Sequence, residues 1–244
     1  MPFKETSRSV EIITRQQIEN APSRNIAELL SFANGIDIRQ RGIGGAQADI
    51  SVRGGTFDQT LVLLDGFPLA DPQTGHHLLN LPIDVQNIER IEILKGTGAR
   101  VFGQNAFAGV INIVSKTPNT EGSANFGAQY EEFASLTLRA GLNLPMKYAP
   151  TRFSYTRQRS NGYRPNSDYA IENFYAQSQV RVLGRKIDVL AGHTERKFGG
   201  SGFYAGPSTN GLRLCLWITR PMNMRKLKQV LPLPKLNWAI TIGL

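Results

Sequence analysis

Two β-branched runs joined by a glycine-rich connection, residues 88–116, constrain the fold of this chain more than any other stretch. The first run, 88–95, reads IERIEILK and the second, 109–116, reads GVINIVSK. Isoleucine and valine at this density favour β-strands. Gly96 and Gly98 open the connection, and glycine permits positive φ and close backbone approach. The stretch therefore predicts two strands joined by a compact, irregular loop.

Two shorter motifs precede this stretch: the sequence VRGG at 52–55 and the apolar run LVLLDG at 61–66. In this order, the segments resemble the plug domain of TonB-dependent outer-membrane receptors. That family has an RG pair at a strand end, an apolar strand ending in DG, an ERIE strand ending in KG, and a closing GxINI strand. The resemblance assigns these motif positions to Gly54, Asp65, Gly66, Glu92, Lys95, Gly96, Gly109 and Asn112.

The segment before these motifs predicts two short helices. Thr14 and Gln17 have the spacing of a capping box, and the helix that they begin ends before Pro22. Ser23 is expected to cap a second helix, which Gly35 terminates. The run 61–64 is apolar on both faces, which is typical of a strand inside a covered sheet. The fold class expected for residues 1–118 is an α+β plug domain: a small mixed sheet with two short helices.

The pattern changes after Pro118, where apolar and polar residues alternate along five segments. These segments are 124–131, 134–142, 152–156, 174–182 and 186–191. Such alternation is typical of transmembrane β-barrels and also of soluble β-sandwiches, and the position after a plug-like segment favours the barrel. Short connections near 147–149 and 184–185 and a long polar one at 159–170 fit periplasmic turns and an external loop. We therefore expect antiparallel strands of an incomplete transmembrane β-barrel at 119–196.

Residues 197–244 are interpreted as an external loop followed by an aberrant basic tail. The alternation stops near Gly211, and 211–244 contains six of the 28 basic residues and no acidic residue. The net charge of +9 therefore falls to +3 over the first 210 residues, which argues against a nucleic-acid binder. The abrupt break indicates a junction or a frame change, with an unusual external loop as the alternative. Cys215 is the single cysteine, so the chain contains no internal disulfide.

The resemblance implies a cell outer-membrane location, in contact with lipid. Residues 1–8 lack the apolar core of a signal peptide, so the chain is expected to lack its true start. The TonB-binding motif of intact relatives would precede Met1. The expected partners are TonB, in those relatives, and a metal-siderophore complex or cobalamin as transported substrate. A periplasmic binding or signalling module without transport activity is the alternative function.

Two arginines, Arg53 and Arg90, occupy motif positions at which the family places a lock between plug and barrel. The resemblance pairs them with carboxylates of the barrel wall. Sheet-edge arginines that face solvent or pair locally are the alternative, for instance Arg90 with Glu92 or Asp65. The resemblance also places two loops, 41–48 and 66–77, beneath the substrate, with the candidate contacts Arg41, Gly44, Gln47, Pro68, Asp71, Gln73 and His76.

No motif in the chain predicts catalysis, a cofactor or a metal. The glycine-rich segments are not followed by Gly-Lys-Ser/Thr, and Gly-x-Ser-x-Gly does not occur. The pair His76-His77 lacks the spacing of a metal site. The function expected from the sequence is therefore that of a receptor or transporter and not that of an enzyme.

Overall fold

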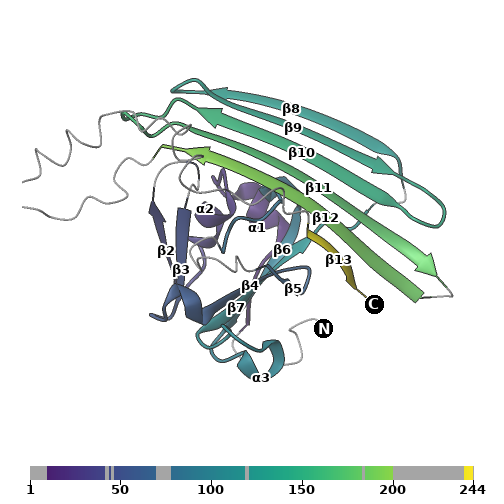
Figure 1. Cartoon of the computed structure of the whole chain (residues 1–244), viewed down its shortest axis with the longest axis horizontal. Helices are drawn as coiled ribbons and strands as arrows, with labels where there is room; N and C mark the ends of the chain where they lie inside the picture. The colour runs from purple at the N-terminus through teal and green to yellow at the C-terminus, as the bar shows by residue number, and fades with distance from the viewer. Residues whose placement is uncertain are drawn as a thin grey trace, which may run out of the picture.

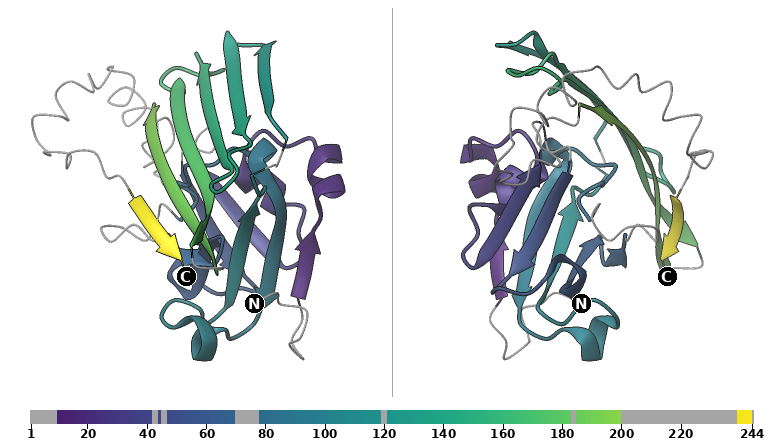
Figure 2. Two further views of the ribbon diagram at one scale, coloured as in Figure 1. Left: turned by 90° about the vertical axis from the view of Figure 1, so that its right-hand side faces the viewer. Right: turned by 60° about the vertical axis from the view of Figure 1, so that its left-hand side comes forward.

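The computed structural model describes residues 10–41, 44, 47–69, 78–118, 121–182, 185–199 and 239–243. The chain forms a compact N-terminal unit, residues 10–118, and a long curved sheet that arches over one side of it (Figure 1). Two further views show the curved sheet standing beside the unit and extending past it at one end (Figure 2). The described part thus has the α+β unit and the following antiparallel strands that the sequence predicts.

A five-stranded mixed sheet forms the centre of the N-terminal unit, in the order β1-β6-β7-β4-β5. Its strands are β1 (Val10–Ile13), β4 (Thr60–Leu64), β5 (Phe67–Pro68), β6 (Ile88–Lys95) and β7 (Gly109–Ser115). β4 and β7 are parallel, whereas the other neighbours are antiparallel. Every residue of β4 is buried, which confirms that this apolar run lies inside a covered sheet.

Helices and a separate hairpin cover the sheet. The helices are α1 (Arg15–Asn20), α2 (Ile26–Leu30) and α3 (Ala99–Phe102), with short 3-10 turns η2 (Phe57–Gln59) and η3 (Val85–Asn87). The hairpin pairs β2 (Ile36–Arg41) with β3 (Gln47–Val52). Leu29 and Leu30 of α2 pack in one core with Ile50 of β3 and Ile91 of β6. Burial of these apolar faces holds the unit together.

The caps of the two N-terminal helices differ in how well the sequence predicted them. Thr14 and Gln17 form the expected capping box of α1. The expected cap at Ser23 is wrong, because Asn25 caps α2 and accepts the N–H of Glu28 at 2.9 Å. Glu28 in turn accepts the N–H of Arg24 at 2.7 Å, so Asn25 and Glu28 provide the cap in place of Ser23.

The curved sheet is an antiparallel meander in the order β13-β12-β11-β10-β9-β8. Its strands are β8 (Ser123–Glu131), β9 (Ser135–Leu144), β10 (Thr151–Ser160), β11 (Tyr169–Val182), β12 (Arg185–Phe198) and β13 (Ala239–Gly243). The polar face turns toward the N-terminal unit: Ser154, Thr156 and Gln158 are buried, whereas the intervening Tyr155 and Arg157 are exposed. Apolar residues occupy the outward face, where Phe126 pairs across strands with Ala140.

Two features of the curved sheet differ from the sequence expectation. Strands β10, β11 and β12 are longer than the alternating segments 152–156, 174–182 and 186–191. The tail, in which no strand was expected, contributes β13, whose residues Ala239–Gly243 pair with Gly192–Asp188 of β12. Residues 200–238 of the tail segment lie outside the described residues.

Among the residues that the structure describes, no helix is both long and apolar enough to cross a bilayer.

Candidate functional site at the junction of the two units

The motif residues of the N-terminal unit form one hydrogen-bonded network around Asn112. The Asn112 side chain accepts the N–H of Gly66 at 2.9 Å and donates to Glu92 at 3.0 Å. Glu92 is 4% exposed, and its other oxygen accepts from Arg90 at 2.8 Å. Three sequence motifs separated along the chain therefore meet in adjacent strands, since β7 lies between β4 and β6.

Asp65 links this network to the curved sheet. Its carboxylate accepts the backbone N–H of Ser115 at 2.8 Å, and its second oxygen lies 2.7 Å from Ser115 Oγ. The phenol of Tyr175, on β11, donates to that second oxygen at 3.3 Å. Ser115 Oγ also lies 3.2 Å from the side-chain oxygen of Gln177, two residues further along β11. The tight Asp65-Gly66 turn therefore touches the sheet directly.

Burial raises the pKa of Asp65 above its ordinary value of 3.8. The hydrogen bonds from Ser115 and Tyr175 oppose this shift, and the charge of Asp188 adds to it. Desolvation of the carboxylate is thus only partly offset by its donors. Asp65 is thus a partly buried titratable group that contacts both units.

Three arginines of the curved sheet reach acceptors on the N-terminal unit. Arg139 Nε lies 3.0 Å from Asp84 Oδ2, and that carboxylate side chain is 4% exposed. Arg152 donates to Asn87 Oδ1 at 2.7 Å, and Arg196 donates to the carbonyl of Leu79 at 3.1 Å. All three acceptors belong to the segment from Leu79 to Asn87, which leads into β6. This segment is held to the curved sheet along its length.

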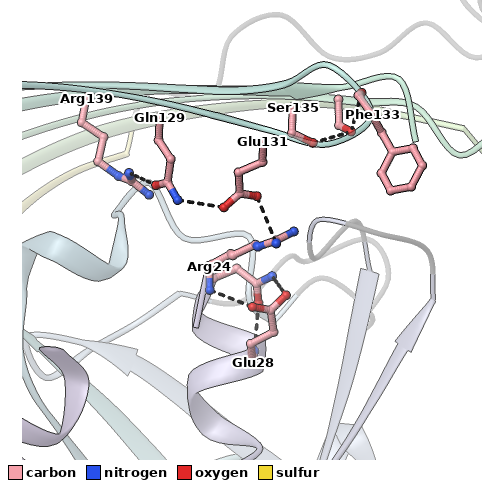
Figure 3. A network of polar contacts seen from close by, with 9 residues as sticks. Arg24, Glu28, Gln129, Glu131, Phe133, Ser135 and Arg139 are labelled. Atoms are coloured by element: carbon pink, nitrogen blue, oxygen red, sulfur yellow. Dashed lines mark hydrogen bonds and ion pairs between the residues drawn. The ribbon is translucent and has the colours of Figure 1, made fainter. Parts of the chain in front are cut away.

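A second chain of contacts joins α2 to the strands β8 and β9 (Figure 3). Arg24 forms an ion pair with Glu131 at 3.0 Å. Glu131 accepts from Gln129 at 2.8 Å, and Gln129 accepts from Arg139 at 3.3 Å. Because Arg139 also binds Asp84, the chain of contacts leaves the N-terminal unit at Arg24 and returns to it at Asp84.

The two arginines of the expected lock do not reach the curved sheet within the described residues. Arg90 pairs with Glu92 of its own strand. Arg53 is exposed, has positive φ (50°), and forms no ion pair with the residues described here. Its backbone N–H bonds the carbonyl of Gly35 at 2.9 Å. The roles are reversed at three of these contacts, because the curved sheet provides Arg139, Arg152 and Arg196 and the N-terminal unit the acceptors. The Arg24–Glu131 pair keeps the expected direction, from an arginine of the N-terminal unit to a carboxylate of the curved sheet.

The remaining motif residues make contacts or turns within the N-terminal unit. Lys95 forms an ion pair with Glu11 of the neighbouring strand β1. Gly54 and Gly96 have positive φ values, 78° and 114°, which suit glycine. Gly109 packs so closely that an added Cβ would lie 2.9 Å from the carbonyl of Leu94.

The expected substrate loops are described only in part. Asp71, Gln73 and His76 lie outside the described residues, as does the side chain of Arg41. Gln47 begins β3, and Pro68 pairs with Leu63. Gly44 lies against the ring of Tyr169, the first residue of β11, because a Cβ there would be 2.7 Å from Tyr169 Cζ. The loop between β2 and β3 therefore reaches the end of the curved sheet at which the connection 161–168 joins β10 to β11.

The arrangement is suited to holding two units together and not to bond chemistry. Within the described ranges, no group of three or more His, Cys, Asp or Glu side chains is placed to hold a metal. Sequence reasoning missed Asp84, Arg139, Arg152 and Tyr175. For Arg139, Arg152 and Tyr175, the signal that could have identified them is their position. They occupy inward-facing sites of alternating strands, among polar neighbours.

Comparison with known proteins identifies the N-terminal unit. Residues 2–110 match the profile of the TonB-dependent receptor plug domain. The chain is 30% identical over 162 residues to the vitamin B12 transporter BtuB of Vibrio vulnificus, covering 66% of this chain and 24% of that protein. It is 36% identical over 146 residues to BtuB of Vibrio cholerae, covering 58% of this chain and 23% of the relative. The chain thus spans about a quarter of the length of these curated relatives.

The fold is also shared with solved receptors. The ferripyoverdine receptor of the outer membrane of Pseudomonas aeruginosa aligns with a TM-score of 0.66, over 80% of this chain and 26% of the receptor. The identity of 17% makes this a likeness of fold. These relatives are transporters and receptors, in agreement with the expectation that the chain is not an enzyme.

Proposed function

Because this chain belongs to the TonB-dependent receptor family, we propose that it is the plug and the first wall strands of an outer-membrane nutrient receptor. In this proposal the N-terminal unit is the plug, and the curved sheet is part of the surrounding barrel. The plug blocks the barrel at rest and is displaced when TonB acts on the receptor. The outer membrane is the corresponding location, with lipid against the outward face of the sheet.

The observation that carries the proposal is the polar junction between the two units. The inward face of the curved sheet offers side-chain donors and acceptors, which meet Asp65, Asp84 and Asn87. The outward face presents apolar side chains such as Phe126 and Tyr130, which are 77% and 75% exposed. A polar inward face and an apolar outward face are typical of a transmembrane barrel wall. This polarity supports the receptor over a free binding module, which would have no lipid-facing sheet.

The proposed substrate is a scarce metal-siderophore complex or cobalamin. The named vitamin B12 transporters among the relatives favour cobalamin, and the ferripyoverdine receptor represents the siderophore alternative. The loops 41–48 and 66–77 are the proposed contact region. Two observations support this placement: Gly44 lies against Tyr169, and Leu79, just after the second loop, binds Arg196 near the same end of the sheet.

A chimeric receptor tests the proposal. Residues 10–199 of this chain replace the matching segment of the Vibrio cholerae vitamin B12 transporter, in a strain that lacks its own transporter. Growth on limiting vitamin B12, with normal levels of the chimera in the outer membrane, is the expected result. Asp84→Ala in the chimera is expected to weaken growth, because the plug loses its buried bond to the wall. The exposed Lys186→Gln serves as the control.

A chimera that reaches the outer membrane but supports no uptake would overturn the cobalamin assignment. Binding of ferric siderophores by the full chain, measured by fluorescence quenching in detergent, then decides the alternative. Absence of binding to both substrate classes would overturn the receptor proposal itself.

A further inference from the structure

A polar cavity of about 330 Å³ separates the N-terminal unit from the curved sheet at a place that the proposed gating does not explain. α1, the segment 84–87 and the residue after β7 line one side. Inward-facing residues of β8, β9 and β10 line the other. Its charged side chains are Arg15, Glu19, Asp84, Lys116, Arg139 and Arg152.

The cavity lining has more positive than negative charge. Arg15 pairs with Glu19 at 2.7 Å, and Arg139 pairs with Asp84 at 3.0 Å. These pairs use both carboxylates of the lining. Lys116 and Arg152 are left without a carboxylate partner among the described residues, so the lining carries two cations in excess.

Lys116 and Arg152 line the same cavity, and both residues contact Asn87. The backbone N–H of Lys116 donates to the Asn87 carbonyl at 2.8 Å, and Arg152 donates to the Asn87 side chain at 2.7 Å. Asn87 is a neutral acceptor and offsets no charge. The Nε of Arg152 is buried and has no hydrogen-bond partner among the described residues. A buried donor without an acceptor is costly, so Arg152 keeps hydrogen-bonding capacity that the described residues do not use.

The electrostatics of Lys116 agree with this geometry. Its pKa is lowered first by burial and then by the positive charges of Arg15 and Arg152. Glu19 and Glu89 oppose the shift but do not cancel it. The positive groups therefore act on one another within a confined space, where an added negative charge would be stabilised.

We propose that this cavity binds a small oxyanion, of which inorganic phosphate is the model, between Lys116 and Arg152. A guanidinium presents paired donors that match phosphate oxygens, and an ammonium adds a point charge. Asn125, Gln129 and Thr156 add polar side chains to the lining. The bound anion connects the two units, since Lys116 follows β7 and Arg152 lies on β10.

The source of the oxyanion is the solution and not a lipid headgroup. The cavity lies between two protein layers and is lined from the inward, polar face of the curved sheet. A lipid lies against the opposite, apolar face. A dissolved ion reaches the cavity without passing through that sheet.

Calorimetric titration of inorganic phosphate into the full chain, folded in detergent, tests the site. At pH 7 and constant ionic strength we expect saturable binding. Lys116→Gln should weaken the affinity at least about tenfold, which corresponds to the loss of one charge-assisted contact. Lys116→Arg should retain binding because it keeps the charge. Lys186→Gln, an exposed lysine on β12, is the matched control and should bind as the unchanged chain does.

Absence of saturable binding, or equal affinity in Lys116→Gln, would overturn the site. Phosphatidylglycerol added to the micelles should leave the phosphate affinity unchanged. Competition by this lipid would overturn the assignment to a dissolved ion.

Discussion

Arg139 of β9 lies 3.0 Å from the carboxylate of Asp84, across the boundary between the plug and the barrel strands. The Asp84 side chain is 4% exposed and that of Arg139 20%, whereas Arg24 and Glu131 of the second pair at this boundary are 65% and 31% exposed. Both pairs have a nitrogen–oxygen distance of 3.0 Å but differ in burial, so a comparison of the two isolates the effect of burial on stability.

Arg139→Ala should destabilise the chain by about 3 kcal/mol, because the Asp84 carboxylate is left buried and without its ion-pair partner. Arg24→Ala or Glu131→Ala should cost no more than about 1 kcal/mol, since Arg24 is 65% exposed. Urea unfolding of the chain in detergent, followed by circular dichroism, measures both. Equal costs for the two pairs would contradict this assignment.

Asp65→Asn should change the pH dependence of stability. The pKa of Asp65 is raised by burial, so the folded chain holds this proton more tightly than the unfolded chain does. The contribution of Asp65 to folding stability therefore becomes less favourable as the pH rises from the ordinary pKa of 3.8 through the raised pKa. Asparagine has no such titration and tolerates the positive φ of 51° at this position.

The stability difference between Asp65→Asn and the unchanged chain should consequently shift in favour of the variant as pH rises through that window. Urea midpoints of both proteins at several pH values from 4 to 8 give this difference. A difference that stays constant, or shifts toward the unchanged chain, would show that the carboxylate is not desolvated in the folded state.

Gly109→Ala should destabilise the chain by about 1–3 kcal/mol through overpacking. The new Cβ would lie 2.9 Å from the carbonyl oxygen of Leu94 and 3.0 Å from Val52 Cγ1, between two central strands and the hairpin. Gly127→Ala on β8 is the matched control, because a Cβ there has no atom within 4 Å. In thermal unfolding, the midpoint temperature should fall for Gly109→Ala and stay unchanged for Gly127→Ala.

Arg90→Ala should cost about 1–3 kcal/mol, more than a solvated pair would. Its partner Glu92 is 4% exposed and, among the described residues, would retain only the amide of Asn112. Arg53→Ala should change stability by less than about 0.5 kcal/mol, because this side chain is exposed and makes no ion pair with the described residues. Denaturant midpoints compare the two, and a large effect at Arg53 would contradict its exposed position.

The sequence predicted those parts of the fold that depend on neighbours in the chain. The strands at 60–64, 88–95 and 109–115 are confirmed because their β-branched runs favour strands locally. The Asp65-Gly66 turn is confirmed, since both residues have the positive φ that aspartate and glycine tolerate. The ends of β10 and β11 were missed because charged residues occupy outward positions there, as in the Arg157–Glu172 pair, and interrupt the alternation.

The contacts across the junction were not predictable in the same way. Arg139 and Asp84 are 55 positions apart, and Tyr175 and Asp65 are 110 apart. Spacing along the chain contains no information on such pairs, which are set by how the sheet curves around the unit. Local patterns placed Arg139 and Arg152 on strands, but only the fold shows which acceptors they meet.

The polar inward face of the curved sheet determines how the two units can come apart. Within the described core, the sheet contributes Tyr175 and Leu190 to the hydrophobic cluster of the N-terminal unit. The junction also contains hydrogen bonds and ion pairs, for which water can substitute at modest cost. Withdrawal of the N-terminal unit would therefore expose the interface to water without exposing a large apolar surface. Such an interface can dissociate and form again repeatedly, with little tendency to aggregate while the two units are separated.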